Sequence, residues 1–478
     1  MPIIYKKKKK KTKASLAFIA LALACLAACG KNEPAVTVGE TTEEPVPEVK
    51  MVTIADKNGK SDFVLVVDDN ESDGARLNLL QVRDAVSAVS GKRMETVNSI
   101  LLRDSYKKTV LFGSIGRESS EKANAELAKD EYIIRFCRTD EGGELVVAYN
   151  GAAARMCAVD RLIDDYISDD GFIVPEDLDI KGKCGMKDAV VTTSIQGLRD
   201  PFILRTDDGT YYAYGTGWRY YKSNKLDGIW RGPYSCVNAP ADAIDNHWAP
   251  EVHFYNGAYY MITTYKSAKT GHRGCTVMKS LSPEGPFVEI SDGHITPKDW
   301  DSIDGTLYID GDGTPWMIFV HEWTSTSDGI GRMAAARLSS DLSSFVSEPH
   351  ELFTARDPGW AKNNVTDGCF MYRAADGKLW MLWSNWDSEG YCVGLAYSED
   401  GTVTGKWKQE ARRLYTKSLG FDFDGGHGML FSDADGSLKL ALHSPNSSSA
   451  GRSETTVILP VTEKYGKLVL DFYKPREE

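Results

Sequence analysis

The chain has 478 residues, of which 42% are hydrophobic and 26% are charged, and its formal net charge is −12 at pH 7. This length exceeds what one hydrophobic core usually holds, so at least two domains are expected. A strongly acidic chain is repelled by nucleic-acid phosphates and by anionic lipid headgroups, so the composition excludes both as partners.

The start of the chain predicts a lipoprotein signal peptide over residues 1–28. Lys6–Lys11 and Lys13 form a basic segment, and the apolar stretch Ala14–Ala28 is too short to span a bilayer comfortably. Small residues then precede Cys29, a pattern that resembles the lipobox of bacterial lipoproteins. The resemblance implies cleavage before Cys29 and lipidation of its thiol. A plain signal peptide or an uncleaved anchor is the alternative.

Export has consequences for charge and location. Cleavage removes seven lysines and no acid, so the net charge falls from −12 to −19. We expect an exported protein, lipid-anchored to the outer membrane at its periplasmic face or on the cell surface, that touches the membrane only through its lipid. Residues 29–50 are rich in Pro, Glu and Thr, which predicts a disordered tether.

Residues 51–185 have the pattern of a small α+β domain. Strands are predicted at 63–67, 109–114 and 144–150, and helices at 76–89 and 152–167. This order is similar to the accessory domain ahead of the catalytic domain in family 20 hexosaminidases and family 67 α-glucuronidases. No catalytic constellation occurs here, so we expect a packing or spacer role.

The cysteines do not indicate a metal site. Seven remain besides Cys25 and Cys29, and they are scattered: Cys137, Cys157, Cys184, Cys236, Cys275, Cys369 and Cys392. Because no Cys-x-x-Cys pair occurs, zinc is not expected. Export permits disulfides, but the spacing does not assign them.

From residue 190 the pattern changes to short aromatic and β-branched runs separated by Asp-Gly and Asn-Gly turns. One unit occurs five times: a polar residue, a short strand, a tight turn and a second aromatic strand. The copies begin roughly 50–60 residues apart, the size of a four-stranded propeller blade. Residues 190–475 are therefore predicted to form an all-β five-bladed β-propeller, with a β-sandwich as the alternative.

The first residue of each inner strand should lie at one mouth of the central channel. Five positions are then predicted to converge: Asp200, Glu251, Asp304, Asp367 and His427. Crowded carboxylates push each other's pKa values apart, as paired acid–base catalysis requires. A calcium site or a hydrogen-bonded closure network is the alternative interpretation.

These residues lie in motifs that resemble family 43 glycoside hydrolases. The motifs are LRDPFIL (198–204), HWAPEVHFYNGAYYM (247–261), SIDGTLYIDGDGTPWMIF (302–319), VTDGCFMYR (365–373) and GGHGMLF (425–431). The resemblance implies an inverting five-bladed propeller enzyme, and family members act mostly on α-L-arabinofuranosides and β-D-xylosides.

The resemblance also implies catalytic roles. Asp200 matches the general base that activates water, and Asp304 matches the carboxylate that orients the acid and tunes its pKa. Asp367 stands where most members have a glutamate general acid, and it is one methylene shorter. Glu322 ends the second strand of the third repeat and is predicted to return to the mouth near Asp304. Asp367 and Glu322 are equal candidates for the acid.

Further residues are candidates for substrate binding: Trp248, Glu251, Trp323, Trp386 and His427. The tryptophans are expected to form walls of the sugar pocket, with propeller packing as the alternative for Trp248. No cofactor is expected to be required. The resemblance implies a place for structural Ca²⁺ in the central channel near His427, but one histidine does not define a metal site.

The sequence therefore predicts an inverting exo-glycosidase that acts on α-L-arabinofuranosyl or related furanoside and β-xyloside linkages of oligo- and polysaccharides. An exo mode is expected because long loops close such pockets, and the segment 320–365 is a candidate loop. The alternatives are a non-catalytic glycan-binding lipoprotein and a related retaining propeller enzyme, in which the carboxyl pair lies closer together.

Overall fold

The computed structural model describes residues 49–71, 73–140, 142–184, 189–447, 453–464 and 466–472. The predicted signal peptide, the lipidation site at Cys29 and nearly all of the predicted tether lie outside these residues. In the described part of the chain, no helix is both long and apolar enough to cross a bilayer.

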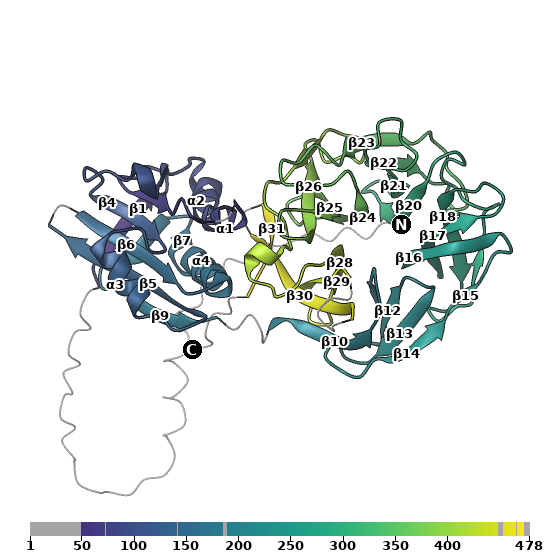
Figure 1. The fold of residues 1–478 in the computed structure, drawn as a ribbon, viewed down its shortest axis with the longest axis horizontal. Coiled ribbons are helices and arrows are strands. Elements are labelled where there is room, and N and C mark those ends of the chain that lie inside the picture. Colours follow the sequence, from purple (N-terminus) through teal and green to yellow (C-terminus); the bar gives the residue numbers. More distant parts are fainter. Residues whose placement is uncertain are drawn as a thin grey trace, which may run out of the picture. The chain divides into compact units, whose positions relative to one another are not determined.

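The first part of the described chain combines two sheets with four α-helices (Figure 1). The larger sheet has the order β3 (Thr96–Asn98), β2 (Val64–Val67), β4 (Lys108–Phe112), β6 (Gly142–Tyr149), β5 (Glu131–Thr139) and β9 (Asp179–Lys183). The smaller sheet joins β1 (Met51–Asp56), β8 (Gly171–Pro175) and β7 (Ile167–Ser168). The helices are α1 (Asp73–Leu79), α2 (Gln81–Ser90), α3 (Glu118–Ala125), α4 (Ala152–Tyr166) and the 3₁₀ turn η1 (Ser99–Leu101).

The central strands β2, β4 and β6 pair in parallel, and they are buried almost throughout. Parallel strands with both faces covered appear as continuous apolar runs, which explains the pattern of the sequence here. The helix predicted over 76–89 is instead two helices, α1 and α2. They are interrupted at Leu80, where a ψ of −8° departs from helical geometry.

Helix α4 connects this part of the chain to the C-terminal segments. Its Cys157 forms a disulfide with Cys184, a pairing that the sequence spacing did not assign. Cys157, Leu419 and Phe472 belong to one continuous buried apolar cluster. Arg155 of α4 also donates to the carbonyl of Ser418 at 2.8 Å.

Residues 191–470 are all-β, and Figure 1 shows five sheets placed around a common centre. The first contains β11 (Phe202–Arg205), β12 (Tyr211–Gly215), β13 (Arg219–Ser223) and β14 (Arg231–Ser235). The second contains β15 (Val237–Asn238), β16 (Ala243–Tyr255), β17 (Ala258–Ser267), β18 (Arg273–Ser280) and β19 (Phe287–Glu289). The third contains β20 (Ser302–Ile309), β21 (Pro315–His321), β22 (Arg332–Arg337) and β23 (His350–Thr354).

The last two sheets complete this propeller-like arrangement. The fourth contains β24 (Asp367–Arg373), β25 (Leu379–Trp386), β26 (Tyr391–Ser398) and β27 (Trp407–Gln409). The fifth contains β28 (Gly426–Ser432), β29 (Leu438–Ser444), β30 (Thr455–Lys464), β31 (Lys467–Leu470) and, from the start of the region, β10 (Val191–Gln196). The 3₁₀ turn η2 (Lys417–Leu419) precedes β28.

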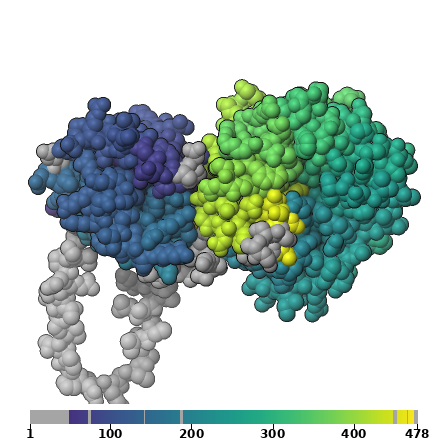
Figure 2. Space-filling model, viewed as in Figure 1, coloured from purple at the N-terminus to yellow at the C-terminus, as the bar shows by residue number. Residues whose placement is uncertain are grey.

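The sheets close on themselves in two ways. Strand β10 pairs antiparallel with β30, so the beginning and the end of the region share one sheet. The first strands also contact one another in turn, from β11 through β16, β20 and β24 to β28, and β28 returns to β11. On the face that Figure 2 shows, neighbouring sheets meet in a continuous packed surface. Residues at the start of these first strands are therefore brought together.

The segment 320–365, predicted as a long loop that closes the pocket, is interrupted by two short strands and is otherwise turn and loop. It contains β22 and β23, which extend the third sheet outward. The uncharged run MAAA within RMAAAR is buried throughout, which fits a strand covered on both faces. The loop prediction fails for these two strands, and the role of the remaining loops in closing a pocket stays a prediction.

The aromatic core between sheets three and four predicts a large stability cost for Trp383→Ala. Trp383 is fully buried, its ring lies 5.1 Å from that of Trp360, and its Nε1 donates to Gln409. We expect a loss of about 3–5 kcal/mol in the free energy of unfolding, measured by chemical denaturation. Ile229→Ala, at a position that is 82% exposed, should stay within about 0.5 kcal/mol of the wild type. Equal losses in the two variants would contradict this packing.

Candidate active site

The innermost strand of each sheet contains a residue with left-handed backbone or begins within two residues of one. These residues are Asp200, Ala249, Asp304, Gly368 and His427, with φ between 43° and 56°. In the last four the strand pairing shifts register at that position, as a β-bulge does. Such a kink turns the following side chains toward the mouth of the ring.

In two sheets the left-handed residue is not the predicted repeat position, although Glu251 and Asp367 still lie close enough to act on the charge of His427 and on the buried group around Asp304. The residue in register with Asp200 and Asp304 is Ala249 rather than Glu251, which lies two positions further along β16. In the fourth sheet it is Gly368, one position after Asp367. The repeat pattern alone did not show these offsets, because a bulge adds a residue without changing the alternation of the strand that follows.

A hydrogen bond from one sheet to the next holds the left-handed residues. Their backbone N–H groups donate to side chains on or just after the second strand of the preceding sheet: Asp200 to His443 Nδ1, Ala249 to Thr216 Oγ1, Asp304 to Thr264 Oγ1 and His427 to Ser384 Oγ. The N–H of Gly368 instead donates to Oδ2 of Asp304, at 2.9 Å. One site carboxylate therefore takes part in the closure of the ring.

Asp200 is buried beside three positively polarised groups. Its Oδ1 lies 3.2 Å from Nδ1 of His427 and 3.6 Å from Nε of Arg199, and its Oδ2 accepts from Thr216 at 2.6 Å. Burial alone would raise the pKa of Asp200, but the imidazolium of His427 and the guanidinium of Arg199 hold it well below the usual range. Asp200 is therefore ionised across the neutral range.

His427 is the cation between the two central carboxylates. Its Nδ1 lies 3.2 Å from Asp200 and 3.7 Å from Asp304. Burial opposes its charge, yet the two aspartates and Glu251 raise the pKa of His427 to about 9. An imidazolium has no lone pair for a metal, and the described residues contain no group of three or more His, Cys, Asp or Glu that could hold one. The structural calcium that the resemblance implied near His427 stays a prediction.

Asp367 lies in the same buried group, with the opposite electrostatic balance. Burial and the neighbouring charge of Asp304 raise the pKa of Asp367 to about 7. Tyr391 donates its hydroxyl to Oδ2 of Asp367 at 3.1 Å. Burial also raises the pKa of Asp304. The site thus holds one carboxylate that stays ionised and one that keeps its proton near neutral pH.

Glu322 follows β21 and is held by a different partner. Its Oε2 accepts from Nε of Arg273 at 2.7 Å, and its backbone N–H donates to the carbonyl of Asp301. Burial raises the pKa of Glu322, and the guanidinium opposes that rise. The return toward the mouth occurs as predicted from the antiparallel pairing, but the carboxylate is committed to an ion pair.

The predicted sugar-binding residues occupy different positions. The ring of Trp248 stacks under Arg273, with 5.9 Å between ring centre and guanidinium, and Trp323 is 43% exposed. Trp386 ends β25 and contacts Tyr391, with ring centres 4.5 Å apart. Glu251 is buried against His253, at 3.0 Å, which leaves its carboxylate satisfied within the protein.

Several residues of the site were not assigned from the sequence. His443 is fully buried and its pKa falls to about 3, because burial outweighs the attraction of Asp200. Its Nδ1 accepts from the N–H of Asp200, so the proton lies on Nε2, which faces Asn446. Arg199 donates to Glu454 at 2.7 Å. Its place beside Asp200 in the Arg-Asp-Pro motif was the available signal, whereas Tyr391 gave none.

Comparison with known proteins places these features in a family. The sequence model of glycosyl hydrolases family 43 matches residues 192–465, more than half of the chain. The chain is similar to an endo-arabinase from Bacteroides thetaiotaomicron, of known crystal structure, with 38% identity and a TM-score of 0.52 over 58% of this chain and 99% of that one.

Two further relatives have a lower sequence identity to this chain. "Probable arabinan endo-1,5-alpha-L-arabinosidase A" of Emericella nidulans is 24% identical over 259 residues, which cover 52% of this chain and 74% of that protein. "Extracellular endo-alpha-(1->5)-L-arabinanase 1" of Bacillus subtilis is 27% identical over 247 residues, covering 48% and 73%. The family that the five motifs indicated is confirmed. The likeness of residues 51–185 to an accessory domain stays a prediction.

The close approach of Gly368 to His427 predicts that Gly368→Ala disrupts the site. A Cβ at this position would lie 2.8 Å from Cγ of His427 and 2.9 Å from its Cα, so the imidazolium must shift away from Asp200. We expect a loss of activity of more than about a hundredfold. Gly377→Ala, also at positive φ but with nothing within 4 Å, is the matched control for backbone strain. Similar activities of the two variants would show that the position of His427 is unimportant.

Proposed function

Because the chain belongs to family 43 of the glycosyl hydrolases and is therefore a hydrolase of glycosidic bonds, we propose that it cleaves α-L-arabinofuranosyl linkages with inversion. We further propose that its five sheets are the blades of a closed five-bladed β-propeller with the acid–base pair at one mouth. The observation that carries the chemistry is the placement of Asp200 against the imidazolium of His427 and of Asp367 beside the carboxylate of Asp304, which drives their pKa values apart.

In the proposed reaction, Asp200 accepts a proton from a water molecule as the water oxygen bonds to the anomeric carbon. The bond from that carbon to the glycosidic oxygen breaks, and Asp367 delivers its proton to the departing oxygen. Water ends as the new anomeric hydroxyl, and the leaving group ends as an alcohol. Inversion requires about 6.5–9.5 Å between the two carboxyl groups so that water fits between substrate and base.

Asp304 and His427 act as positioning residues in this proposal. Asp304 raises the pKa of Asp367 through its charge, and its Oδ2 is fixed by the N–H of Gly368. His427 balances the buried charge of Asp200 and Asp304. Neither residue has to exchange a proton with substrate.

The contacts favour Asp367 over Glu322 as the acid. A general acid must hold its proton at working pH, and a carboxylate 2.7 Å from a guanidinium is stabilised in its ionised form. Asp367 instead faces the negative charge of Asp304. We assign Glu322 and Arg273 to the binding of the leaving group, beside Trp248.

The linkage is taken from the names of the relatives: the Bacteroides structure is named an endo-arabinase, and the Emericella and Bacillus proteins are named endo-acting on α-1,5-arabinan. Those names favour cleavage within a chain, whereas the sequence predicted release from an end. A β-xyloside stays a second candidate glycone. We also propose that export and a lipid on Cys29 hold the enzyme at the outer membrane, on the strength of the signal-like sequence.

The proposed base predicts a collapse of activity in Asp200→Asn. An amide cannot accept the proton of water, so we expect at least about a hundredfold loss of product release from linear α-1,5-arabinan. Asp208→Asn, in the exposed turn of the same sheet, is the control and should retain full activity. Product lengths separate an endo mode from an exo mode, and 4-nitrophenyl β-D-xyloside tests the second glycone. The first product seen by NMR should have the inverted anomeric configuration; a retained one would refute the proposed mechanism.

Two measurements distinguish Asp367 from Glu322 as the general acid: the pH dependence of kcat/KM, and the activity on substrates that differ in their leaving group. With wild-type enzyme, kcat/KM should fall as pH rises through about 7, because Asp367 then loses the proton it must deliver. Asp367→Asn should lose that alkaline limb and should retain activity only on aryl arabinofuranosides with acidic leaving groups. Glu322→Gln should keep the limb and lose activity on all substrates alike. The reverse pattern would make Glu322 the acid.

A further inference from the structure

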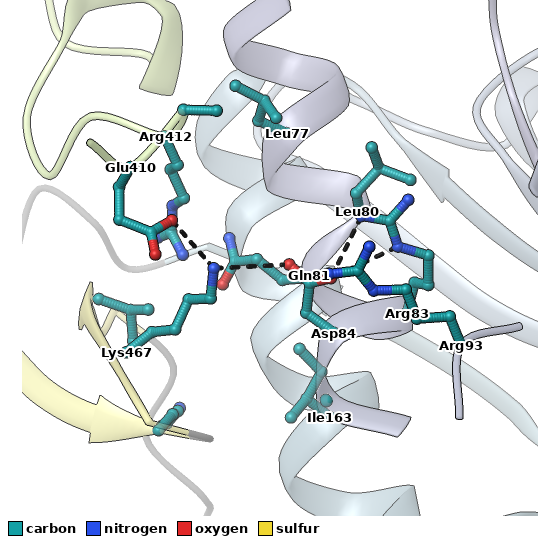
Figure 3. Close-up of a pocket in the computed structure, with 14 residues that line it drawn as sticks. Leu77, Leu80, Gln81, Arg83, Asp84, Arg93, Ile163, Glu410, Arg412 and Lys467 are labelled. Atoms are coloured by element: carbon teal, nitrogen blue, oxygen red, sulfur yellow. Dashed lines mark hydrogen bonds and ion pairs between the residues drawn. The ribbon is translucent and has the colours of Figure 1, made fainter. Parts of the chain in front are cut away.

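A second site lies apart from the acid–base residues, in a cavity of about 180 Å³ (Figure 3). It is lined by the helices α1, α2 and α4, by the segment after β27, and by β30 and β31. It shares no residue with the candidate active site. Its volume is below the ~300–1,000 Å³ of pockets for drug-sized ligands, so its occupant is a small group such as one sugar ring.

The cavity is cationic in an acidic protein. Five basic side chains line it and only two acidic ones: Arg83, Arg93, Arg412, Lys464 and Lys467 against Asp84 and Glu410. The whole chain carries a net charge of −12. A concave surface with this local excess of positive charge attracts anions.

Three of the five cations already have partners within the protein. Arg83 lies 3.2 Å from Asp84, and Lys467 lies 3.0 Å from Glu410, as the dashed lines in Figure 3 show. Lys464 pairs with two aspartates, at 2.9 Å and 3.1 Å. These pairs account for both acidic groups that line the cavity.

The other two cations of the cavity are the guanidinium groups of Arg93 and Arg412. In the part of the chain that the structure describes, neither Arg93 nor Arg412 makes a hydrogen bond or ion pair, and Nε of Arg412 is buried without a partner. Burial lowers the pKa of Arg412 to about 10, so it stays charged at neutral pH. Arg93 is exposed at the rim of the cavity, whereas the Nε of Arg412 is buried. A buried and unpaired cation is costly, and a planar guanidinium fork fits a carboxylate or phosphate.

The rest of the lining is aliphatic. Leu77, Leu80, Ile163 and Val469 offer carbon surface next to the charges. Such a surface suits the C–H face of a sugar ring better than a bare inorganic ion. The carboxylates of Asp84 and Glu410 also repel a phosphate dianion more strongly than a carboxylate monoanion.

We propose that this cavity binds the carboxylate of an acidic sugar, a hexuronate, through Arg93 and Arg412, with the sugar ring against the aliphatic wall. The N-terminal helices would then hold an acidic residue of the glycan while the propeller acts on another part of it. This binding does not depend on the proposed reaction.

The test is calorimetric titration of the full chain with D-glucuronate, D-glucose and inorganic phosphate. Glucuronate and glucose differ only in the carboxylate, so glucuronate should bind and glucose should not. Arg93→Gln should weaken glucuronate binding at least about tenfold, because it removes one charge-assisted pair. Lys92→Gln is the matched control, since Lys92 is exposed, adjacent and absent from the lining. Arg412→Lys keeps the buried charge but lacks the fork, and it should also bind more weakly.

The outcomes separate this proposal from the proposed function. Asp200→Asn should bind glucuronate like wild type even though it is inactive on arabinan. Absence of glucuronate binding, unchanged affinity in Arg93→Gln, or equal binding of glucose would overturn the site. Tighter binding of phosphate than of glucuronate would make it an inorganic anion site and would overturn the sugar assignment.

Discussion

The ion pairs of His427 with Asp200 and Asp304 are the interaction on which the rest of the site depends. Two carboxylates buried side by side repel each other, and one of them would take up a proton if no cation lay between them. With the imidazolium in place, Asp200 stays ionised, while the charge of Asp304 is left to act on Asp367. The charge of His427 therefore keeps Asp200 ionised and, because it leaves Asp304 charged, favours the protonated form of Asp367.

The same residues also hold the ring of sheets closed. His443 accepts the N–H of Asp200 at the position where Thr216, Thr264 and Ser384 accept equivalent N–H groups elsewhere in the ring. In the remaining sheet the acceptor is the carboxylate of Asp304 itself. Because the site residues are part of the closure, their side chains are fixed by the strand geometry rather than by mobile loops.

The sequence predicted the family, the strand repeats and the convergence of Asp200, Asp304 and His427, because alternation and turn residues report directly on strands. It did not predict that Ala249 takes the position expected of Glu251, since a bulge shifts the register without leaving a compositional sign. It also assigned 320–365 to a loop, although RMAAAR is a buried strand whose small residues carry little hydrophobic signal. Tyr391 and Arg273 contact the site from segments outside the five motifs, and only the folded chain brings them to it.

The aspartate at position 367 can be understood from the same electrostatics. Asp367 directly precedes Gly368, whose N–H is bonded to Asp304, so a short side chain keeps its carboxyl close to that negative charge. Coulombic coupling weakens with distance, and a longer glutamate would carry its carboxyl further away. Compared with a glutamate, an aspartate at this position therefore has a more strongly raised pKa, but its carboxyl group extends less far toward the substrate. On the side where we propose that the leaving group binds, Arg273 is paired with Glu322 and lies over the ring of Trp248.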